Sequence, residues 1–193
     1  VAVGANIRRQ GEEARRGAVV VKAGMPLGGA QVGMAAAVGY RSVMVHPRPR
    51  IAILSTGNEL ATGTGRIRAC QIRDANGPAI RAALAGFGFP ATPLPVAGDE
   101  PRQLATAICA ALAEHEVLLL SGGVSVGRHD YVLEAIRRAG GGIRFHGVAM
   151  KPGKPALHAV RRGRQIFGLP GNPVAALTVL HLLALPALRR MSG

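Results

Sequence analysis

Four acidic side chains follow predicted strands, at positions where proteins with parallel sheets carry out their chemistry. Asp74, Asp99 and Asp130 are the only aspartates of the chain, and Glu59 comes soon after the first apolar strand. Ligands of open parallel α/β sheets bind outside the carboxyl ends of the strands. A helix N-cap explains Asp74 or Asp99 equally well when each is taken singly. Taken as a set, the four carboxylates favour a binding site.

Three turns rich in glycine are expected at the same end of the sheet. They occupy residues 55–57, 121–127 and 169–173, each between a predicted strand and a predicted helix. Glycine lets backbone N–H groups approach an anion closely, and the N-terminus of a following helix adds a favourable dipole. One such turn is weak evidence, because turns use glycine in any case. Three together predict a ligand that carries phosphate.

The turn Lys-Pro-Gly-Lys-Pro at residues 151–155 holds two of the three lysines, whereas every other basic residue except Lys22 is arginine. Lys151 and Lys154 can face one anion, and the prolines restrict the turn before any ligand binds. Lysine suits a compact oxyanion as a point charge, whereas arginine suits planar bidentate partners. A solvated basic turn is the alternative, and the use of arginine elsewhere argues for the anion site.

Together these residues indicate one chemistry, in which a metal ion and several cations hold anionic ligands. Glu59, Asp99 and Asp130 are the candidate ligands of Mg²⁺, since magnesium takes carboxylate and substrate oxygens together. His129 is a lesser candidate, because it lies beside Asp130. The other histidines and the two cysteines lack metal-ligand spacing. Ser121 and Ser125 lack a convincing arrangement of His and Asp for a hydrolase triad.

The composition excludes several classes of protein. With 193 residues, of which 48% are hydrophobic, the chain can build a core, unlike a disordered chain. Two cysteines exclude a disulfide scaffold. The apolar stretch 175–188 is shorter than a bilayer span and contains His181 and Pro186, so no membrane crossing is expected. The first residues form no secretory signal, which predicts a cytoplasmic protein.

The net charge of +14 is the one feature that suggests nucleic acid. However, the arginines are scattered in pairs, and 3% aromatic residues without tryptophan offer no stacking surface for single strands. Codon bias in a GC-rich genome produces the same composition. We therefore expect small-molecule ligands, and neither nucleic acid nor a membrane as the main partner.

The order of predicted elements indicates an α/β fold. From Arg50 onward apolar strands alternate with helices, which is typical of a mostly parallel sheet covered on both faces. The predicted strands are 51–54, 91–97, 116–120 and 143–150, with a hairpin at 156–169, and the predicted helices are 78–86, 101–115, 130–140 and 173–190. Prolines in 91–97 suggest an edge strand. Pro186 is expected to kink or end the last helix.

A stiff Pro-Arg-Pro linker at residues 47–49 predicts a domain boundary. Residues 1–48 are expected to be a partial, β-rich N-terminal domain, with strands around 18–22 and 42–46 and a glycine-weakened helix between them. Residues 49–193 are expected to form a three-layer α/β/α domain. Because the chain starts at Val1 without Met, we expect it to be part of a longer protein.

Five motifs, in this order, resemble the molybdopterin molybdotransferase family, to which the E domain of gephyrin is related. They read ILSTGNEL, QIRDAN, SGGVSVGRHDY, MKPGKP and FGLPGNPVAA, and the lead-in NIRRQGEEARRGAVVVKAG is also similar to that family. The resemblance implies a molybdopterin-binding fold. It further implies the Mg²⁺-dependent insertion of molybdate into adenylylated molybdopterin, with release of AMP. A homodimer, and other proteins of molybdenum cofactor biosynthesis, are the implied partners.

The resemblance also implies roles for residues at the matching positions. The catalytic and metal-binding positions fall on Glu59, Asp99 and Asp130, with Glu100 as the reserve for Asp99. The molybdate-binding positions fall on Lys151 and Lys154. The molybdopterin-binding positions are Thr56, Gly57, Asp74, Asn76, Gly122, Gly123, Ser125, Pro170, Gly171, Asn172 and Pro173.

The chain departs from the family pattern in two respects. Asn58 stands where the family often has Asp, and Cys70 where it often has Gly. Family members also carry a further N-terminal region and a C-terminal β domain, so a non-catalytic molybdopterin-binding or scaffold fragment is the alternative function. A molybdopterin adenylyltransferase is a third candidate; that enzyme shares the core fold but usually has a threonine-rich GGTG-type loop and lacks the KPGKP segment.

Overall fold

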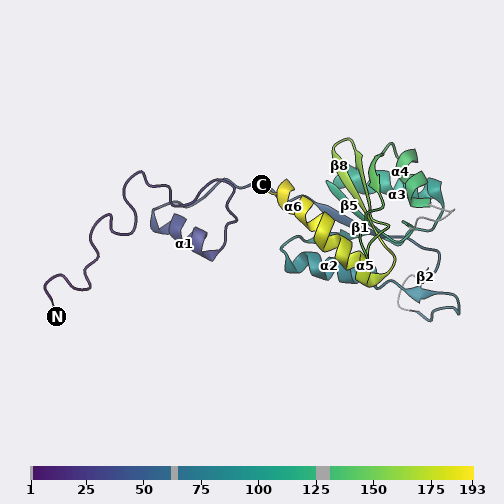
Figure 1. Cartoon of the computed structure of the whole chain (residues 1–193), viewed down its shortest axis with the longest axis horizontal. Helices are drawn as coiled ribbons and strands as arrows, with labels where there is room; N and C mark the ends of the chain where they lie inside the picture. Colours follow the sequence, from purple (N-terminus) through teal and green to yellow (C-terminus); the bar gives the residue numbers. More distant parts are fainter. Residues whose placement is uncertain (1, 62–64, 125–130) are drawn as a thin grey trace. The chain divides into compact units, whose positions relative to one another are not determined.

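The computed structural model of the chain describes residues 2–61, 65–124 and 131–193 (Figure 1). Its internal contacts divide it into two units, residues 1–46 together with Gly193, and residues 47–192. The assignment of 1–48 and 49–193 to domains of the family stays a prediction.

The N-terminal unit contains one helix, α1 (Gly29–Ala37), and no strand among its described residues. The strands predicted around 18–22 and 42–46, and with them the β-rich character of this unit, are therefore wrong. A strand needs a partner for its N–H and C=O groups, which β-branched residues alone do not supply. Val19 and Met44 stay exposed and α1 buries none of its residues, so this unit lacks a core on which strands would pair.

The second unit is built on a six-stranded sheet with the order β4-β1-β5-β8-β7-β6. β4, β1, β5 and β8 are parallel, and β7 is antiparallel to both of its neighbours. Two successive antiparallel pairings make β6 run in the same direction as the four parallel strands. The strands are β1 (Ile51–Ser55), β4 (Ala91–Pro93), β5 (Val117–Ser121), β6 (Gly142–His146), β7 (Leu157–Arg161) and β8 (Arg164–Leu169).

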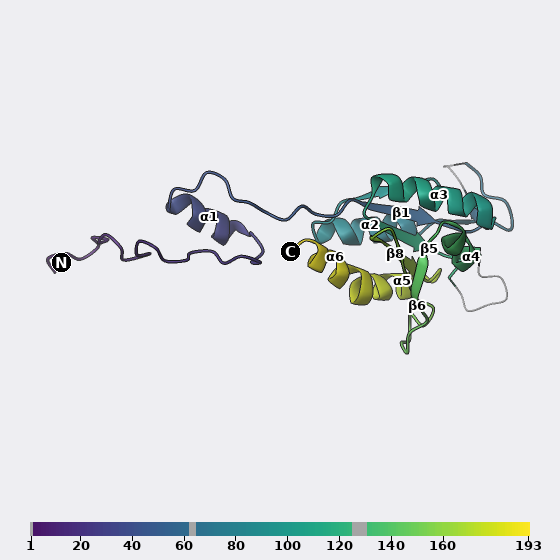
Figure 2. The ribbon, with the colours of Figure 1, turned by 90° about the horizontal axis from the view of Figure 1, so that it is seen from above.

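Helices cover both faces of this sheet, which confirms the predicted α/β/α architecture (Figure 2). α3 (Pro101–Glu114) and α4 (Tyr131–Arg138) pack on one face, and α2 (Asn76–Gly86) and the C-terminal helix on the other. One strand serves both layers because its side chains alternate. Leu118 of β5 faces α3 and α4, Leu119 faces the other layer, and both are fully buried. Each such burial stabilises the fold by about 1.5–3 kcal/mol.

The edge strand and the hairpin agree with the sequence predictions. β4 lies at an edge of the sheet. Proline is tolerated there, because the N–H that Pro93 lacks is not needed to pair with a further strand. β7 and β8 are joined through Arg162 and Gly163, whose φ angles of 49° and 80° are those of a tight hairpin turn of type I′. A separate pair of short parallel strands, β2 (Leu60–Ala61) and β3 (Ile72–Arg73), follows β1 along the chain.

The C-terminal helix consists of α5 (Pro173–Val179), a π-helical stretch η1 (Leu180–Ala184) and α6 (Leu185–Met191). The helix therefore continues past Pro186 instead of ending there. A proline inside a helix has no N–H to donate and clashes with the carbonyl four residues earlier. The π-helical turn ends just before Pro186, which stands in the first turn of α6, where proline is tolerated.

By length and composition alone, the 19 residues Pro173–Met191 could cross a membrane, although the shorter stretch 175–188 did not suggest this. Single helices of this kind are weak evidence for a membrane, since core helices meet the same criteria. Val179, Ala184 and Leu188 are fully buried against the sheet and α2. The described structure thus uses this helix as part of its core.

An ion pair between Arg50 and Glu116 links the amino ends of β1 and β5. Glu116 accepts a hydrogen bond from Nη2 of Arg50 at 2.6 Å and another from the backbone N–H of Arg50 at 2.8 Å. The side-chain hydrogen bond from Arg50 is the largest cause that lowers the pKa of Glu116 to about 2. The pair thereby helps to hold the register in which the two strands begin.

Candidate functional site

The three predicted glycine-rich turns meet at the carboxyl edge of the sheet. The backbone N–H of Thr56, after β1, donates to the carbonyl of Ser121 at 2.8 Å. The N–H of Gly122, after β5, donates to the carbonyl of Leu169 in β8 at 3.2 Å. A Cβ on Gly171 would lie 4.0 Å from the Cα of Gly122. The turns after β1, β5 and β8 therefore lie side by side, as the carboxyl ends of neighbouring parallel strands do.

The turn after β5 requires glycine at two successive positions. Gly122 has a φ of +93°, and a Cβ on it would overlap the main-chain oxygen of Thr56. Gly123 has a φ of +65°, and its Cβ would lie 2.6 Å from Cγ2 of Val132 in α4. Because the N–H of Gly122 is bonded to Leu169, only Gly123 of this pair has an N–H without a partner in the described ranges.

The turn after β8 ends in two residues that favour the start of a helix, Asn172 and Pro173. Oδ1 of Asn172 accepts a hydrogen bond from the N–H of Ala175 at 3.1 Å, so Asn172 is the N-cap of α5. Pro173 occupies the first helical position, and Pro170 precedes the turn at the end of β8. The predicted molybdopterin-binding residues of this turn therefore also have a structural role in starting the helix.

Asp74 caps α2 and binds the end of β1. Its Oδ1 accepts a hydrogen bond from the N–H of Gly77 at 3.0 Å, and its Oδ2 accepts one from the hydroxyl of Ser55 at 2.6 Å. Ser55 is 4% exposed, so the second bond satisfies a buried hydroxyl. Both carboxylate oxygens of Asp74 have partners inside the fold, which favours the capping interpretation over direct ligand binding.

Asn76 reaches from α2 to the turn after β8. Its Nδ2 donates a hydrogen bond to the carbonyl of Gly171 at 2.9 Å. Its Oδ1 is buried and has no hydrogen-bond partner in the described part of the chain. A buried acceptor without a partner costs about 1–3 kcal/mol. The fold thus leaves an acceptor open beside the Gly171 turn, where a donor from a water or a ligand would be stabilising.

The acidic loops after β1 and before α3 are joined by a reciprocal pair of hydrogen bonds. The N–H of Asn58 donates to Oδ2 of Asp99 at 3.1 Å, and the N–H of Asp99 donates to Oδ1 of Asn58 at 3.2 Å. Glu59 follows Asn58, so Glu59 and Asp99 lie on neighbouring loops. The Glu59 carboxylate folds back over Gly57, whose Cβ would lie 2.6 Å from Oε2. Sequence reasoning noted Asn58 only as a departure from the family and missed this connecting role.

Glu100 is occupied as the N-cap of α3. Its side chain accepts hydrogen bonds from the backbone N–H groups of Arg102, at 3.0 Å, and of Gln103, at 2.6 Å. These two bonds favour the charged form and lower the pKa of Glu100. Since both oxygens of Glu100 serve the helix, the structure favours Asp99 over Glu100 as the residue available to a ligand.

Lys151 and Lys154 lie in the turn that follows β6. Because β6 runs parallel to β8, this turn leaves the sheet at the same edge as the glycine-rich turns. Gly153 between the lysines is buried, and its Cβ would lie 3.0 Å from Cγ2 of Val179 in α5. The N–H of Val148 donates to the carbonyl of Lys154 at 2.8 Å. The turn is thus anchored on α5, while both lysines remain exposed.

His146 connects the strand before the lysine turn with the loop after β5. Its Nε2 lies 3.2 Å from the carbonyl oxygen of Val124. Val124 itself crosses over β8, since a Cβ on Gly168 would lie 2.7 Å from its Cγ1. The loop after β5 therefore extends toward β6. In the sequence, His146 is one of the histidines that lack metal-ligand spacing, and no sequence pattern signalled this contact.

Ser125, Asp130 and His129 lie outside the described residues. Of the three carboxylates predicted to hold a metal ion, the structure therefore describes Glu59 and Asp99. No group of three or more His, Cys, Asp or Glu side chains within the described residues could hold a metal ion. The metal-binding and catalytic roles stay predictions.

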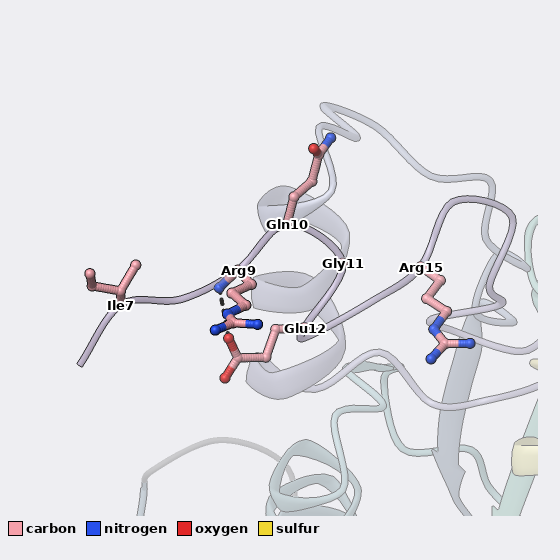
Figure 3. Close-up of a pocket in the computed structure, with 6 residues that line it drawn as sticks. All are labelled: Ile7, Arg9, Gln10, Gly11, Glu12 and Arg15. Carbon is pink, nitrogen blue, oxygen red and sulfur yellow. Dashed lines mark hydrogen bonds between the residues drawn. The ribbon is translucent and has the colours of Figure 1, made fainter. Parts of the chain in front are cut away.

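A hollow in the N-terminal unit contains none of the predicted site residues. Figure 3 shows its lining, which is Ile7, Arg9, Gln10, Gly11, Glu12 and Arg15. The N–H of Arg9 donates to Oε2 of Glu12 at 2.7 Å. All of these residues are exposed, so the hollow is a bend of a solvated segment.

The second unit is an open α/β/α sheet, a class of fold whose ligands bind outside the carboxyl ends of the strands, and its glycine-rich and lysine turns lie at that edge. The family described as "Probable molybdopterin binding domain" matches residues 52–190. The chain belongs to this family, which confirms the resemblance seen in its motifs.

Relatives and solved structures agree with this assignment. The molybdopterin molybdenumtransferase of Staphylococcus epidermidis is 35% identical over 188 residues, which are 97% of this chain and 45% of that protein. This chain therefore spans less than half the length of that relative. The crystal structure of the molybdopterin biosynthesis moea protein from Pyrococcus horikosii matches with a TM-score of 0.82 and 35% identity, covering 95% of this chain and 45% of that one. The molybdopterin biosynthesis enzyme MoaB from Thermus thermophilus, at 22% identity and a TM-score of 0.55, covers 75% of this chain and 97% of its own and shows the fold alone.

Proposed function

We propose that this chain is the molybdopterin-binding part of a cytoplasmic molybdotransferase. The reaction would insert molybdate into the dithiolene of adenylylated molybdopterin and release AMP, with Mg²⁺ required. One observation carries the proposal: in a chain of the molybdopterin-binding family, three glycine-rich turns and the lysine turn leave the sheet at one edge.

The glycine-rich turns are proposed to receive the phosphate and pterin parts of the substrate. The N–H of Gly123 would face an anion, because the neighbouring Gly122 already donates to Leu169. The N-terminus of α5 adds a dipole that favours negative charge. Oδ1 of Asn76 would accept a hydrogen bond from a donor on the ligand, or on a water that accompanies it, which would satisfy a buried atom that has no other partner in the described ranges.

The acidic loops are proposed to hold the metal ion. Glu59 and Asp99 offer the carboxylate oxygens that Mg²⁺ prefers, and they lie on loops joined by the Asn58–Asp99 hydrogen bonds. Asp130 is the third proposed ligand. Mg²⁺ held there would reduce the repulsion between anionic groups of the two substrates. Asp99 is preferred to Glu100 because the carboxylate of Glu100 caps α3.

Lys151 and Lys154 are proposed to bind molybdate. Both are exposed on a turn whose buried glycine fixes it to α5, so their charges are presented from a rigid base. An ammonium group matches a compact, doubly charged oxyanion. Each would orient molybdate by a charge-assisted hydrogen bond at the edge where the glycine-rich turns lie.

The direct test incubates the protein with adenylylated molybdopterin, molybdate and MgCl₂ and measures AMP by chromatography. Because this chain spans 45% of its Staphylococcus relative, the assay is run both on this chain and on a form that carries the further regions of such relatives. Magnesium-dependent AMP release by the longer form is the expected result. The proposal fails if that form releases no AMP.

Matched variants test the individual roles. Asp99→Asn and Asp130→Asn are each expected to abolish magnesium-dependent AMP release, whereas Glu100→Gln leaves it intact. Lys154→Ala should raise the molybdate concentration needed by about tenfold to a hundredfold, the equivalent of a charge-assisted bond of about 1.5–3 kcal/mol. Lys22→Ala, which removes the one lysine outside the turn, is the control. An unchanged molybdate dependence in Lys154→Ala would remove that residue from the site.

A non-catalytic molybdopterin-binding role is the second candidate, since the family that matches residues 52–190 is described by molybdopterin binding alone. It predicts saturable binding of adenylylated molybdopterin without AMP release in either form. An adenylyltransferase would instead consume ATP with molybdopterin alone, which the same chromatography detects.

A further inference from the structure

A second cavity, of about 420 Å³, lies on the sheet face that carries the C-terminal helix. Its floor is formed by β6, β7 and β8, and its wall by the last two turns of the helix, including Leu183, Ala187 and Met191. None of its lining residues belongs to the predicted molybdopterin, molybdate or metal site. Its volume lies in the range of small-molecule pockets, which is roughly 300–1,000 Å³.

A row of three aromatic rings makes the floor of this cavity. Phe145 pairs with His158 across β6 and β7, and His158 pairs with Phe167 across β7 and β8. The His158 and Phe167 rings are stacked, with centroids 4.7 Å apart, and the Phe145 and His158 centroids are 5.6 Å apart. Because the rings stack on one another, the row presents largely apolar ring edges, against which the face of another planar ring packs favourably.

The polar groups of the floor are fixed by one another. Nε2 of Gln165 donates to the carbonyl of Gly163 at 2.9 Å, which leaves its Oε1 facing Nε2 of His158, also at 2.9 Å. Since Oε1 can only accept, Nε2 of His158 carries the hydrogen, and the imidazole is held in one orientation. The floor is therefore a preorganised surface.

A cation stands at the rim of this cavity. Arg190 lines it and is exposed, and its side chain makes no hydrogen bond or ion pair with any residue in the described ranges. Its neighbour Arg189 does not line the cavity; Cζ of Arg189 lies 5.6 Å from the centroid of the Phe87 ring. An apolar, aromatic-lined cavity with one unpaired guanidinium is complementary to a planar molecule that carries one negative charge.

We propose that this cavity binds a planar aromatic anion, whose ring packs on the row of Phe145, His158 and Phe167 and whose carboxylate pairs with Arg190. The site is separate from the proposed molybdotransferase site. Its test involves neither molybdate nor AMP, so either proposal can fail without the other.

The experiment titrates the protein with 2-naphthoate and with its neutral isostere 2-naphthamide. The chain has no tryptophan, so the naphthalene fluorescence can be followed without tryptophan emission. We expect saturable binding of both probes, with naphthoate bound more tightly. Arg190→Gln should weaken naphthoate about tenfold and leave naphthamide unchanged. Arg189→Gln, an identical change on the next residue, should leave both unchanged.

A further variant and a second measurement complete the test. Ala187→Phe is expected to fill the cavity and to remove binding of both probes. Circular dichroism checks that this variant keeps the fold. If it does not fold, the comparison of Arg190→Gln with Arg189→Gln still tests the proposal. The proposal is overturned if the wild-type protein shows no saturable naphthoate binding, or if Arg189→Gln weakens it as much as Arg190→Gln. Sedimentation that shows a dimer broken by Arg190→Gln, with no naphthoate binding, would instead assign this face to a second copy of the chain.

Discussion

Gly122→Ala is expected to destabilise this chain strongly, because two separate costs coincide at the turn after β5. Gly122 has a φ of +93°, in the left-handed region that residues with a Cβ avoid. In addition, the new Cβ would overlap the main-chain oxygen of Thr56. That peptide has little freedom to move, since its N–H, which belongs to Gly57, donates to the carbonyl of Ala97 at 3.2 Å.

The magnitude follows from these two costs. The left-handed conformation costs a residue with a Cβ about 1–2 kcal/mol. Forcing a methyl group into a packed position costs about 1–3 kcal/mol more, because the neighbouring backbone has to shift. We therefore expect Gly122→Ala to lower the free energy of unfolding by about 3 kcal/mol, a large part of the stability of an ordinary domain.

Gly140→Ala is the matched control, and urea unfolding followed by circular dichroism is the assay. Gly140 also has a positive φ, of +79°, but no atom outside its immediate neighbours would lie within 4 Å of its Cβ. It should therefore lose only the conformational part, about 1–2 kcal/mol. If the two variants lost the same stability, the close approach of the turns after β1 and β5 would be refuted.

Three further predictions concern individual carboxylates. Glu116→Gln should cost about 1 kcal/mol at neutral pH, the value for a partly exposed pair, as measured by urea unfolding. The pKa of Glu116 is lowered from 4.5 to about 2, so this stabilisation is present above pH 4.5 and should be lost as the pH falls to about 2. Glu100→Ala should lower the stability by removing the cap of α3. Asp74→Ala should cost about 2–3 kcal/mol, because the buried hydroxyl of Ser55 also loses its partner; thermal unfolding measures both losses.

Controls distinguish these effects from a general change of charge. Glu134→Gln removes one charge from the exposed pair with Arg138, so it should cost at most about 0.5 kcal/mol. Asp74→Asn keeps an acceptor for Gly77 and should cost less than Asp74→Ala. A Glu116→Gln loss that stayed constant down to pH 2 would contradict the proposed ion pair.

The second unit was predictable from the sequence because its patterns are local. Runs such as residues 117–120 are apolar throughout, which is typical of strands buried on both faces. The hairpin turn at Arg162 and Gly163 is likewise determined by the residues in it, and so is the start of α3 at Pro101. Such signals need no knowledge of distant contacts.

The N-terminal valines and Pro186 show where local patterns fail. The run around Val19 has strand propensity, but a strand forms only against a partner, and none is present among the described residues of that unit. At Pro186, packing of Val179, Ala184 and Leu188 against the core favours continuing the helix, and the π-helical turn accommodates the proline. In both places the outcome depended on contacts far along the chain.

For the candidate site, the sequence by itself determined which residue types stand at the ends of strands: the glycines, the carboxylates and the lysine pair. Only the tertiary structure decided how each is used. In the structure, Asp74 and Glu100 cap helices, and Asn58 is hydrogen-bonded to Asp99. Oδ1 of Asn76 has no partner in the described ranges, and Arg190 lies at the rim of a second cavity. The physical reason is that a hydrogen bond depends on which groups meet in space, and the register of the sheet and the packing of its helices bring those groups together from distant parts of the chain.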